Sequence, residues 1–285
     1  MRVGIMLLDN RLSHPVKRVK LRILLTNDDG VQAAGLHAAR RALAHVGEVF
    51  VVAPERPRSA VGHSITLHKP LRLTPVALPD GAEGYACNGT PADCVALGYE
   101  VVMGGRCDLV VSGINAGANL GWDVVYSGTV AGAREGAVIG IPSLAVSLCL
   151  PENVPAGTVS FEPIAAFIGQ VATRIQQHRL PPHVLLNINI PYRPDASELP
   201  IAITRQGRRE YVNRIAVRED PYGRPYYWLG GSVRPEEPEP GSDVYAVQHG
   251  AISITPIHLD MTAYSLMETL QSWNWEPFRV EGATP

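Results

Sequence analysis

The segment from Leu21 to Gly35 constrains the fold of this chain more than any other stretch of its 285 residues. It opens with the continuous apolar run Ile23–Leu25, which is typical of a strand buried on both faces of a parallel sheet. The run ends in the acidic turn Thr26–Gly30, and apolar residues then recur at helical spacing at Leu36, Ala39, Leu43 and Val46. A strand, a tight turn and a helix form the first half of a βαβ unit. In open α/β sheets, ligands bind beyond the carboxyl ends of the strands, where this turn lies.

Two adjacent carboxylates, Asp28 and Asp29, occupy this turn. Neighbouring like charges raise each other's pKa and cost free energy unless a cation lies between them. Because the turn ends in Gly30, both side chains can rotate toward one point, where an oxygen-preferring ion such as Mg²⁺ or Mn²⁺ would neutralise them. The alternative is a structural role, since Asp and Asn are common in turns and at helix N-caps. The turn alone leaves both interpretations open.

The composition is that of an ordinary globular protein, with 46% hydrophobic residues, 18% charged residues and a net charge of −2. This balance excludes the basic footprint that binds duplex nucleic acid or an anionic membrane surface. No apolar run reaches the length of a membrane span. Four cysteines show neither a CxxC pair nor His partners at zinc spacing, which predicts free thiols in a reducing cytoplasm: Cys87, Cys94, Cys107 and Cys149.

The chain divides into three expected parts. Residues 1–20 precede the first strand and form an N-terminal extension, expected to be a flexible tail or an extra strand. Residues 21–200 alternate strands and helices, which predicts an α/β core around a mostly parallel sheet. Residues 201–285 begin with a long antiparallel hairpin, followed by a strand and a helix that return to the core. A hairpin outside an α/β body is often an oligomerisation arm.

Apolar patterns and turn residues predict the remaining elements. Gly47 is expected to cap the first helix, and Thr90 with Pro91 to start another. The expected strands are 49–53, 65–67, 71–73, 108–113, 140–148, 184–190 and 251–256, the hairpin strands are 211–217 and 224–229, and the expected helices are 90–102, 126–137, 161–178 and 262–273.

Three further loops follow strands or open helices near the acidic turn. The loop after the second strand carries Arg58 and Ser59, and the glycine-rich loop after residues 108–113 carries Asn115 and Asn119. The start of the next helix, Ser127–Thr129, offers hydroxyls and free backbone N–H groups that suit a phosphate. Taken alone, each loop has a structural explanation in solvation or helix capping. The glycine-rich loop is not GxGxxG, so a dinucleotide site is not favoured.

Taken in order, the motifs of this chain resemble those of the SurE family, the survival-protein nucleotidases. The resemblance runs from about Leu21 to Tyr264 and rests on LLTNDDGVQAAG, VVAPERPRSAVGHSIT, NGTPADCV, DLVVSGINAGANLGWDVVYSGTVAGAREG and ITPIHLDMTAY. It implies a Rossmann-like α/β core with helices on both faces and a C-terminal antiparallel extension. It also implies hydrolysis of nucleoside monophosphates and a homodimer or homotetramer assembled through that extension.

The resemblance also implies the residues of the site. One divalent ion per subunit, Mg²⁺ or Mn²⁺, would be bound by Asp28, Asp29, Ser59 and Asn115. Asn119 and the segment that contains Ser127, Gly128 and Thr129 would lie by the substrate phosphate. In the mechanism that we expect, Asp29 accepts the proton of the attacking water.

Two positions depart from the family pattern. Ala34 stands where the family commonly has Pro. Near the C-terminus the family Asp is kept as Asp260, but Tyr264 replaces a His that often follows it and that has been considered a proton donor. An acid role at this place is therefore in doubt, and His258 is a candidate substitute.

Two other functions compete with the metal-dependent phosphatase. A phosphatase with a covalent aspartyl-phosphate on Asp28 typically has DxDxT after its first strand, which this chain lacks. A non-catalytic nucleotide sensor on the same fold would bind nucleotides without releasing phosphate. The sequence leaves the substrate open: it does not rank the bases, 5′- against 3′-nucleotides, or short polyphosphate as a side substrate. It also leaves open which metal is preferred and whether the chain forms a dimer or a tetramer.

Overall fold

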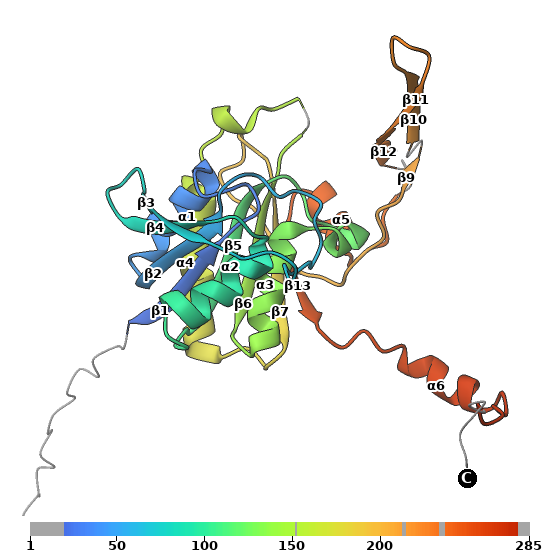
Figure 1. Cartoon of the computed structure of the whole chain (residues 1–285). Coiled ribbons are helices and arrows are strands. Elements are labelled where there is room, and N and C mark those ends of the chain that lie inside the picture. The colour runs from blue at the N-terminus through green and yellow to red at the C-terminus, as the bar shows by residue number, and fades with distance from the viewer. Residues whose placement is uncertain (1–19, 152, 213–214, 234–236, 279–285) are drawn as a thin grey trace, which may run out of the picture.

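The computed structural model describes residues 20–151, 153–212, 215–233 and 237–278, so the expected N-terminal extension lies outside the described residues apart from Lys20. A nine-stranded sheet runs through the molecule in the order β3-β4-β2-β1-β5-β6-β7-β13-β8 (Figure 1). The six strands from β4 to β7 in this order are mutually parallel, whereas β3 and β13 run antiparallel to β4 and β7. The predicted mostly parallel α/β fold is confirmed. The strands are β1 (Leu21–Thr26), β2 (Gly47–Pro54), β3 (Leu73–Ala77), β4 (Glu83–Cys87), β5 (Leu109–Ala116), β6 (Ser143–Cys149), β7 (Val184–Pro191), β8 (Ile201–Ile203) and β13 (Ile252–His258).

Helices cover both faces of this sheet, as expected. Alternate side chains of β1 point to opposite faces, so Ile23 and Leu25 join one apolar cluster while Leu24 joins another, and all three are fully buried. The first cluster holds α1 and α4, and α2 and α3 lie over the opposite face. The helices are α1 (Ala34–Leu43), α2 (Pro91–Leu97) continuing as a π-helical turn (Gly98–Val102), α3 (Gly128–Ile139), α4 (Glu162–His178), α5 (Asp243–Gln248) and α6 (Tyr264–Gln271), with short 3-10 helices η2 (Gly121–Val125) and η3 (Ala156–Thr158).

The C-terminal part leaves the sheet and comes back to it. After β8 the chain forms β9 (Tyr211–Val212), the hairpin strands β10 (Ile215–Glu219) and β11 (Pro225–Leu229), and β12 (Ser232–Val233), and this arm projects from the core (Figure 1). The two ends of the excursion meet, because Arg205 and Ser242 form a parallel bridge and the amide of Asp243 donates to the carbonyl of Arg205 at 2.9 Å. Strands β8 and β13 belong to the central sheet, so the sheet extends beyond residue 200.

Helix α6 does not return to the core, and this part of the prediction is wrong for the single chain. The helix lies away from the sheet, and none of its residues is buried (Figure 1). Its apolar side chains Leu266, Met267 and Leu270 are exposed. An apolar helical pattern shows that one face needs a partner, but it does not say that the partner is in the same chain.

Two local predictions also differ from the structure. Residues 65–67 form no strand, because the backbone N–H of Thr66 donates to the carboxylate of Asp93 at 2.9 Å instead of to a neighbouring strand. Gly47 starts β2 rather than capping the first helix, which ends at Leu43. Strand β3 begins at Leu73, where the expected strand ended.

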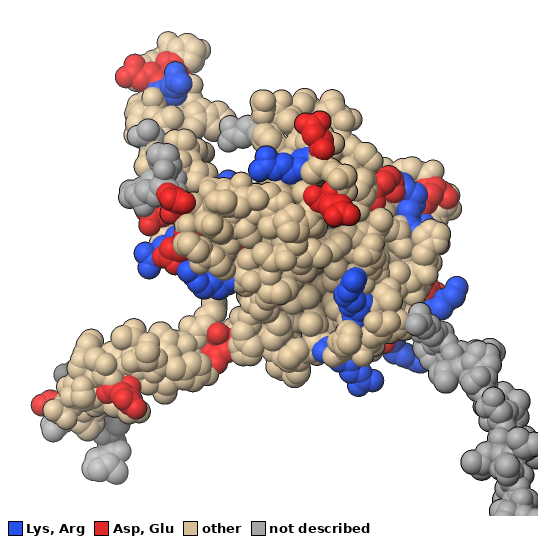
Figure 2. Space-filling view, turned by 180° about the vertical axis from the view of Figure 1, so that it is seen from behind, with Lys and Arg blue, Asp and Glu red and all other residues tan. Residues whose placement is uncertain are grey.

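The surface is of mixed charge. Figure 2 shows acidic and basic side chains interspersed around the rim of the face that it draws, without a large area of one sign. No helix in the described part of the chain is both long enough and apolar enough to cross a membrane.

Candidate active site

The acidic turn after β1 is rigid. The Asn27 side chain bonds both the amide and the carbonyl of Gly30, which adopts a φ of +100° that favours glycine. The backbone then joins the loop after β2: the amide of Val31 donates to the carbonyl of Pro54 at 2.8 Å, and that of Arg58 to the carbonyl of Asp28 at 2.7 Å. The turn and the loop that carries Ser59 are therefore fixed beside each other at the carboxyl edge of the sheet.

The two carboxylates of the turn contact different elements. Asp28 is buried, and its Oδ1 accepts a hydrogen bond from Thr129 Oγ1 at 2.5 Å. Asp29 is half-buried, and its Oδ2 accepts from the backbone N–H of Ala116 at 3.3 Å. Asp28 thus joins the turn to the start of α3, and Asp29 joins it to the end of β5. The structure brings β1, α3 and β5 together around this pair.

Burial raises the pKa of both carboxyl groups. Desolvation is the main cause that raises the pKa of Asp28 to about 6; the charge of Asp29 adds to it, and the hydrogen bond from Thr129 opposes it. Desolvation also raises the pKa of Asp29, against the hydrogen bond from Ala116. Keeping both groups ionised near neutral pH therefore costs free energy unless a cation is present.

The part of the chain that the structure describes supplies no such cation from a side chain. None of the ion pairs among the described residues involves Asp28 or Asp29. No group of three or more His, Cys, Asp and Glu side chains suited to a metal occurs in the part of the chain that the structure describes. Two carboxylates completed by a hydroxyl and an amide form an all-oxygen set, and this set fits a hard divalent ion.

The two neutral ligands expected from the sequence are each adjacent along the chain to a residue whose backbone N–H bonds the acidic turn. Ser59 is exposed in the loop that Arg58 ties to the Asp28 carbonyl. Asn115 precedes Ala116, whose amide bonds Asp29, and its own Nδ2 donates to the carbonyl of Gly117 at 2.9 Å. This bond orients the Asn115 amide. The assignment of Ser59 and Asn115 as ligands stays a prediction.

Helix α3 begins against Asp28. Ser127 is its N-cap, with Oγ accepting from the amide of Val130 at 3.0 Å. A Cβ added to Gly128 would lie 2.7 Å from Asp28 Cβ and 3.0 Å from the carbonyl oxygen of Arg58, so only glycine fits. Thr129 is fully buried and donates its hydroxyl to Asp28. Of the three expected phosphate-binding residues at this helix start, Gly128 and Thr129 are therefore packed directly on the acidic turn.

Asn119 is held by residues that the sequence analysis missed. Its Nδ2 donates to Ser147 Oγ at 2.7 Å, its amide donates to Asn189 Oδ1 at 2.9 Å, and its carbonyl accepts from Asn187 and Asn189. All four side chains are buried. The sequence does contain a signal for them: Asn187 and Asn189 are polar residues in the otherwise apolar strand β7. Buried polar side chains need hydrogen-bond partners, so they indicate a buried polar contact on one face of this strand. The role of Asn119 that the structure shows is to fix the glycine-rich loop; contact with phosphate stays a prediction.

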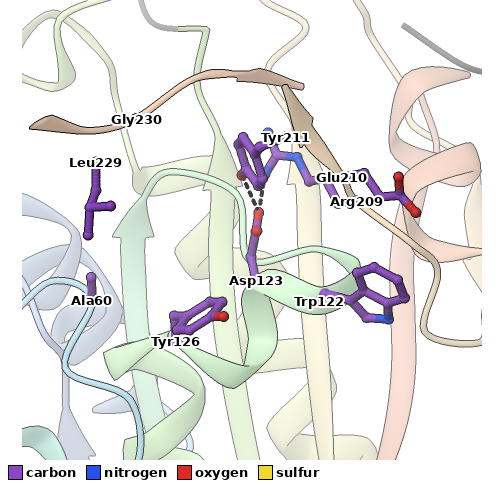
Figure 3. Close-up of a pocket in the computed structure, with 9 residues that line it drawn as sticks. All are labelled: Ala60, Trp122, Asp123, Tyr126, Arg209, Glu210, Tyr211, Leu229 and Gly230. Atoms are coloured by element: carbon purple, nitrogen blue, oxygen red, sulfur yellow. Dashed lines mark hydrogen bonds and ion pairs between the residues drawn. The ribbon is translucent and has the colours of Figure 1, made fainter. Parts of the chain in front are cut away.

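A cavity of about 480 Å³ lies between the core and the arm (Figure 3). Asp123 stands in its wall, and its Oδ2 accepts from Arg209 Nη1 at 2.6 Å and from the Tyr211 hydroxyl at 2.8 Å. The residues that line the cavity are Ala60, Trp122, Asp123, Tyr126, Arg209, Glu210, Tyr211, Leu229 and Gly230.

A second carboxylate outside the acidic turn, Asp243, joins the core to the arm. It is fully buried, and its two oxygens accept from the amides of Gly121 and Gly207, each at 2.8 Å. Neither Asp243 nor Asp123 was singled out from the sequence. The only signal for Asp243 is its place after Ser242, the N-cap of α5.

The residues expected near the C-terminus lie apart from this cluster. The Tyr264 hydroxyl donates to the carboxylate of Asp260, and both side chains are exposed on the stretch after β13. The backbone N–H of Asp260 donates to His258 Nδ1 at 2.9 Å. These three residues bond one another, and no contact joins them to the acidic turn in the described part of this chain.

The fold and the site define a Rossmann-like α/β protein with a paired-carboxylate site at the carboxyl edge of its sheet. The family model described as survival protein SurE matches residues 23–213. The 5′-nucleotidase SurE of Moorella thermoacetica is 52% identical to this chain over 88% of the chain and 95% of the relative, and that of Chloroflexus aggregans is 46% identical over 89% and 99%. The crystal structure of the SurE protein from Aquifex aeolicus has a TM-score of 0.75 and 42% identity, covering 88% of this chain and 98% of that one. The chain belongs to the SurE family, as the sequence motifs predicted.

Proposed function

We propose that this chain is a divalent-metal-dependent phosphatase that hydrolyses nucleoside monophosphates to nucleoside and phosphate. The relatives named 5′-nucleotidase SurE support this activity, with 3′-nucleotides and short polyphosphate as further candidate substrates. The observation that carries the proposal is the pair of buried Asp28 and half-buried Asp29, which has no cationic partner among the described residues and lies beside the start of α3. Such a pair binds a cation, and the helix start binds an anion.

Asp28, Asp29, Ser59 and Asn115 would hold one Mg²⁺ or Mn²⁺ ion per subunit. The chemistry that such an ion supplies is polarisation of a phosphoryl oxygen and acidification of water. Thr129 holds the Asp28 carboxylate in place by its hydrogen bond, and Gly128 lets the helix approach it. Loss of a partner that orients a metal ligand typically lowers affinity or activity about 10–100-fold.

The remaining steps belong to side chains and backbone of the site. Asp29, the more exposed carboxylate, accepts the proton of the attacking water. The start of α3 orients the phosphoryl oxygens through its backbone N–H groups. Ser127 Oγ accepts from Val130, so its own proton stays available for a phosphate oxygen, while the hydroxyl proton of Thr129 is donated to Asp28. Asn119 fixes the loop that closes this side of the site.

We also propose that the chain assembles as a homodimer or homotetramer through its C-terminal extension, in the cytoplasm. The arm exposes apolar and aromatic side chains, among them Val217, Tyr227 and Trp228, and α6 exposes a further apolar face. Exposed apolar patches of this kind mark interaction sites. The free thiols support a reducing compartment.

The test is phosphate release from nucleoside 5′- and 3′-monophosphates with Mg²⁺, with Mn²⁺ and with a chelator. Asp28→Asn and Asp29→Asn should each lower the metal-stimulated rate by at least about a hundredfold, because each removes a charged ligand from the site. Circular dichroism should show both variants folded. Near-normal rates in both variants would contradict the proposal, and nucleotide binding without any phosphate release would identify a sensor. A trapped phospho-enzyme would point instead to Asp28 as a nucleophile.

A further inference from the structure

The loop that carries Ser59 has no place in the sheet and depends on bonds to neighbouring elements. It runs from Arg58 to Thr66, between β2 and β3. On one side of Ser59, the amide of Arg58 donates to the carbonyl of Asp28, and a Cβ added to Gly128 would lie 3.0 Å from the Arg58 carbonyl oxygen. This side of the loop is therefore packed between the acidic turn and the start of α3.

On its other side, Ser59 is followed by backbone that is not supported locally. Ser59, Ala60 and Val61 form no hydrogen bond with any other residue that the structure describes. Ala60 has a φ of +55°, in the left-handed region that a residue with a Cβ rarely adopts. Such a conformation persists only where surrounding contacts hold it. The position of Ser59 therefore depends on the contacts that fix the loop further along.

His63 supplies the first side-chain attachment of the loop after Ser59. Its Nε2 donates to Oε2 of Glu135 on α3 at 2.8 Å, and the two side chains are only 24% and 16% exposed. A hydrogen bond to a carboxylate is stronger than one between neutral groups. The adjacent amide of Gly62 donates to the carbonyl of Tyr126, just before the same helix, at 2.9 Å. The loop is thus attached to α3 at two places.

The contacts further along the loop lead to α2. Thr90 Oγ1 donates to the carbonyl of Ser64 at 2.7 Å, and the carboxylate of Asp93 accepts from both the amide and the hydroxyl of Thr66. These bonds fix the far end of the loop. His63, by contrast, joins the loop to the helix that begins against the acidic turn.

We propose that His63, held by Glu135, is a positioning residue: it fixes the loop so that the hydroxyl of Ser59 stays beside the acidic turn. The proposal rests on the function proposed above and adds to it a pair of residues outside the expected ligand set. His63 acts on the metal ion through the loop and not by contact. Partners that orient metal ligands typically contribute about 10–100-fold in metal affinity.

Metal affinity tests the proposal without turnover. His63→Ala should weaken Mn²⁺ binding, measured by isothermal titration calorimetry, about 10–100-fold, and Glu135→Ala should give a similar loss. His63→Gln should restore most of the affinity, since its side-chain amide can donate to the same carboxylate. His68→Ala is the matched control: it removes an exposed histidine between the same two strands and should bind Mn²⁺ as the wild type does.

A double-mutant cycle shows whether His63 acts through Ser59. Ser59→Ala alone should weaken Mn²⁺ binding. Adding His63→Ala to that variant should cause little further loss, because the group that His63 positions is already gone. Losses that multiply would overturn the proposal, since they would show that His63 supports the site by another route.

Trypsin reports on the loop itself, in the presence of chelator. Cleavage after Arg58, identified by mass spectrometry of the fragments, should be faster in His63→Ala than in the wild type or in His68→Ala. Cleavage within α1, at Arg40 or Arg41, monitors global unfolding and should stay unchanged. Equal cleavage after Arg58 in all three proteins would show that the loop does not depend on His63.

The outcomes separate this proposal from the proposed function. Wild-type Mn²⁺ affinity in a His63→Ala protein that releases phosphate would overturn the positioning role and leave the phosphatase intact. His63-dependent Mn²⁺ binding in a protein that releases no phosphate would support the positioning role and refute the phosphatase. A wild-type protein that binds neither Mn²⁺ nor Mg²⁺ would refute both.

Discussion

Asp28 is the residue at which burial and function conflict most directly. In the folded, metal-free protein its pKa is about 6, against about 3.8 in the unfolded chain. The folded state therefore binds the proton more tightly. The stability that this proton brings is fully present below the unfolded pKa and is lost as the pH rises through about 6.

This conflict predicts the pH dependence of an Asp28→Asn variant. In the presence of chelator, the variant should gain about 1.3 kcal/mol of stability relative to the wild type between pH 5 and pH 7, out of about 3 kcal/mol over the whole titration, because the amide stays uncharged throughout. Urea unfolding at the two pH values measures the difference. A gap between variant and wild type that is the same at both pH values would show that the Asp28 carboxyl titrates normally in the folded state.

At the residue scale, the sequence predicts side chains whose role is local and misses those whose role is distant. The caps Thr90 and Ser127 are confirmed, since each accepts a hydrogen bond from an amide three residues further along the chain. The acidic pair is recognisable from its own turn, whereas its partners Thr129 and Ala116 lie far along the chain, and its role as a metal site stays a prediction. Asp243 is different because it bonds the amide of Gly121, 122 positions away. No spacing rule connects two such positions, and only the folded sheet brings them together.

At the scale of elements, the approach of α3 to the acidic turn is the critical contact. Gly128→Ala places a methyl group 2.7 Å from Asp28 Cβ and 3.0 Å from a backbone carbonyl, neither of which can move freely. We expect a loss of about 1–3 kcal/mol in the free energy of unfolding, typical of overpacking, together with loss of metal-stimulated activity.

Gly157→Ala is the matched control for this substitution. Gly157 lies in η3 and has no atom within 4 Å of an added Cβ, so stability and turnover should stay unchanged. Thermal unfolding and phosphate release measure both variants. A Gly128→Ala protein as stable and active as Gly157→Ala would show that the start of α3 can shift away from Asp28.

Most elements of the core follow from local sequence, and the exceptions have identifiable physical causes. Strand β1 and helices α2, α3 and α4 were expected at nearly their observed bounds. Residues 65–67 have the apolar alternation of a strand, yet the Asp93 carboxylate takes both the amide and the hydroxyl of Thr66. A side chain that binds backbone groups in this way competes with sheet pairing. Helix α5 was not expected, because its six residues are too few to show a period.

At the scale of the whole molecule, the arm and α6 expose apolar surface that the described part of this chain does not cover. Val217 and Tyr227 oppose each other on the hairpin, and both are more than half exposed. In Figure 2 the arm and the segment of α6 carry few charges along most of their length. The sequence predicts such apolar surfaces but not which chain covers them.

If the hairpin is the interface of an oligomer, a charge introduced there should cause the oligomer to dissociate into smaller species. Val217→Glu or Tyr227→Glu should lower the molar mass measured by light scattering, because a buried unpaired carboxylate at an interface costs several kcal/mol. Val138→Glu is the control, since Val138 is a half-exposed apolar residue on α3, away from the arm. A wild-type mass in both hairpin variants would place the interface elsewhere.

The bridge between Arg205 and Ser242 affects how easily the length of the arm can change among proteins of this fold. A segment whose two ends are already joined can be lengthened or shortened at small entropic cost, because loop closure depends only weakly on length. The arm is in effect an insertion whose two ends are held together at the Arg205–Ser242 bridge. Since Arg209 and Tyr211 at its root also line the cavity beside Asp123, a change in the arm alters the shape of this cavity as well, while the strands beneath keep their order.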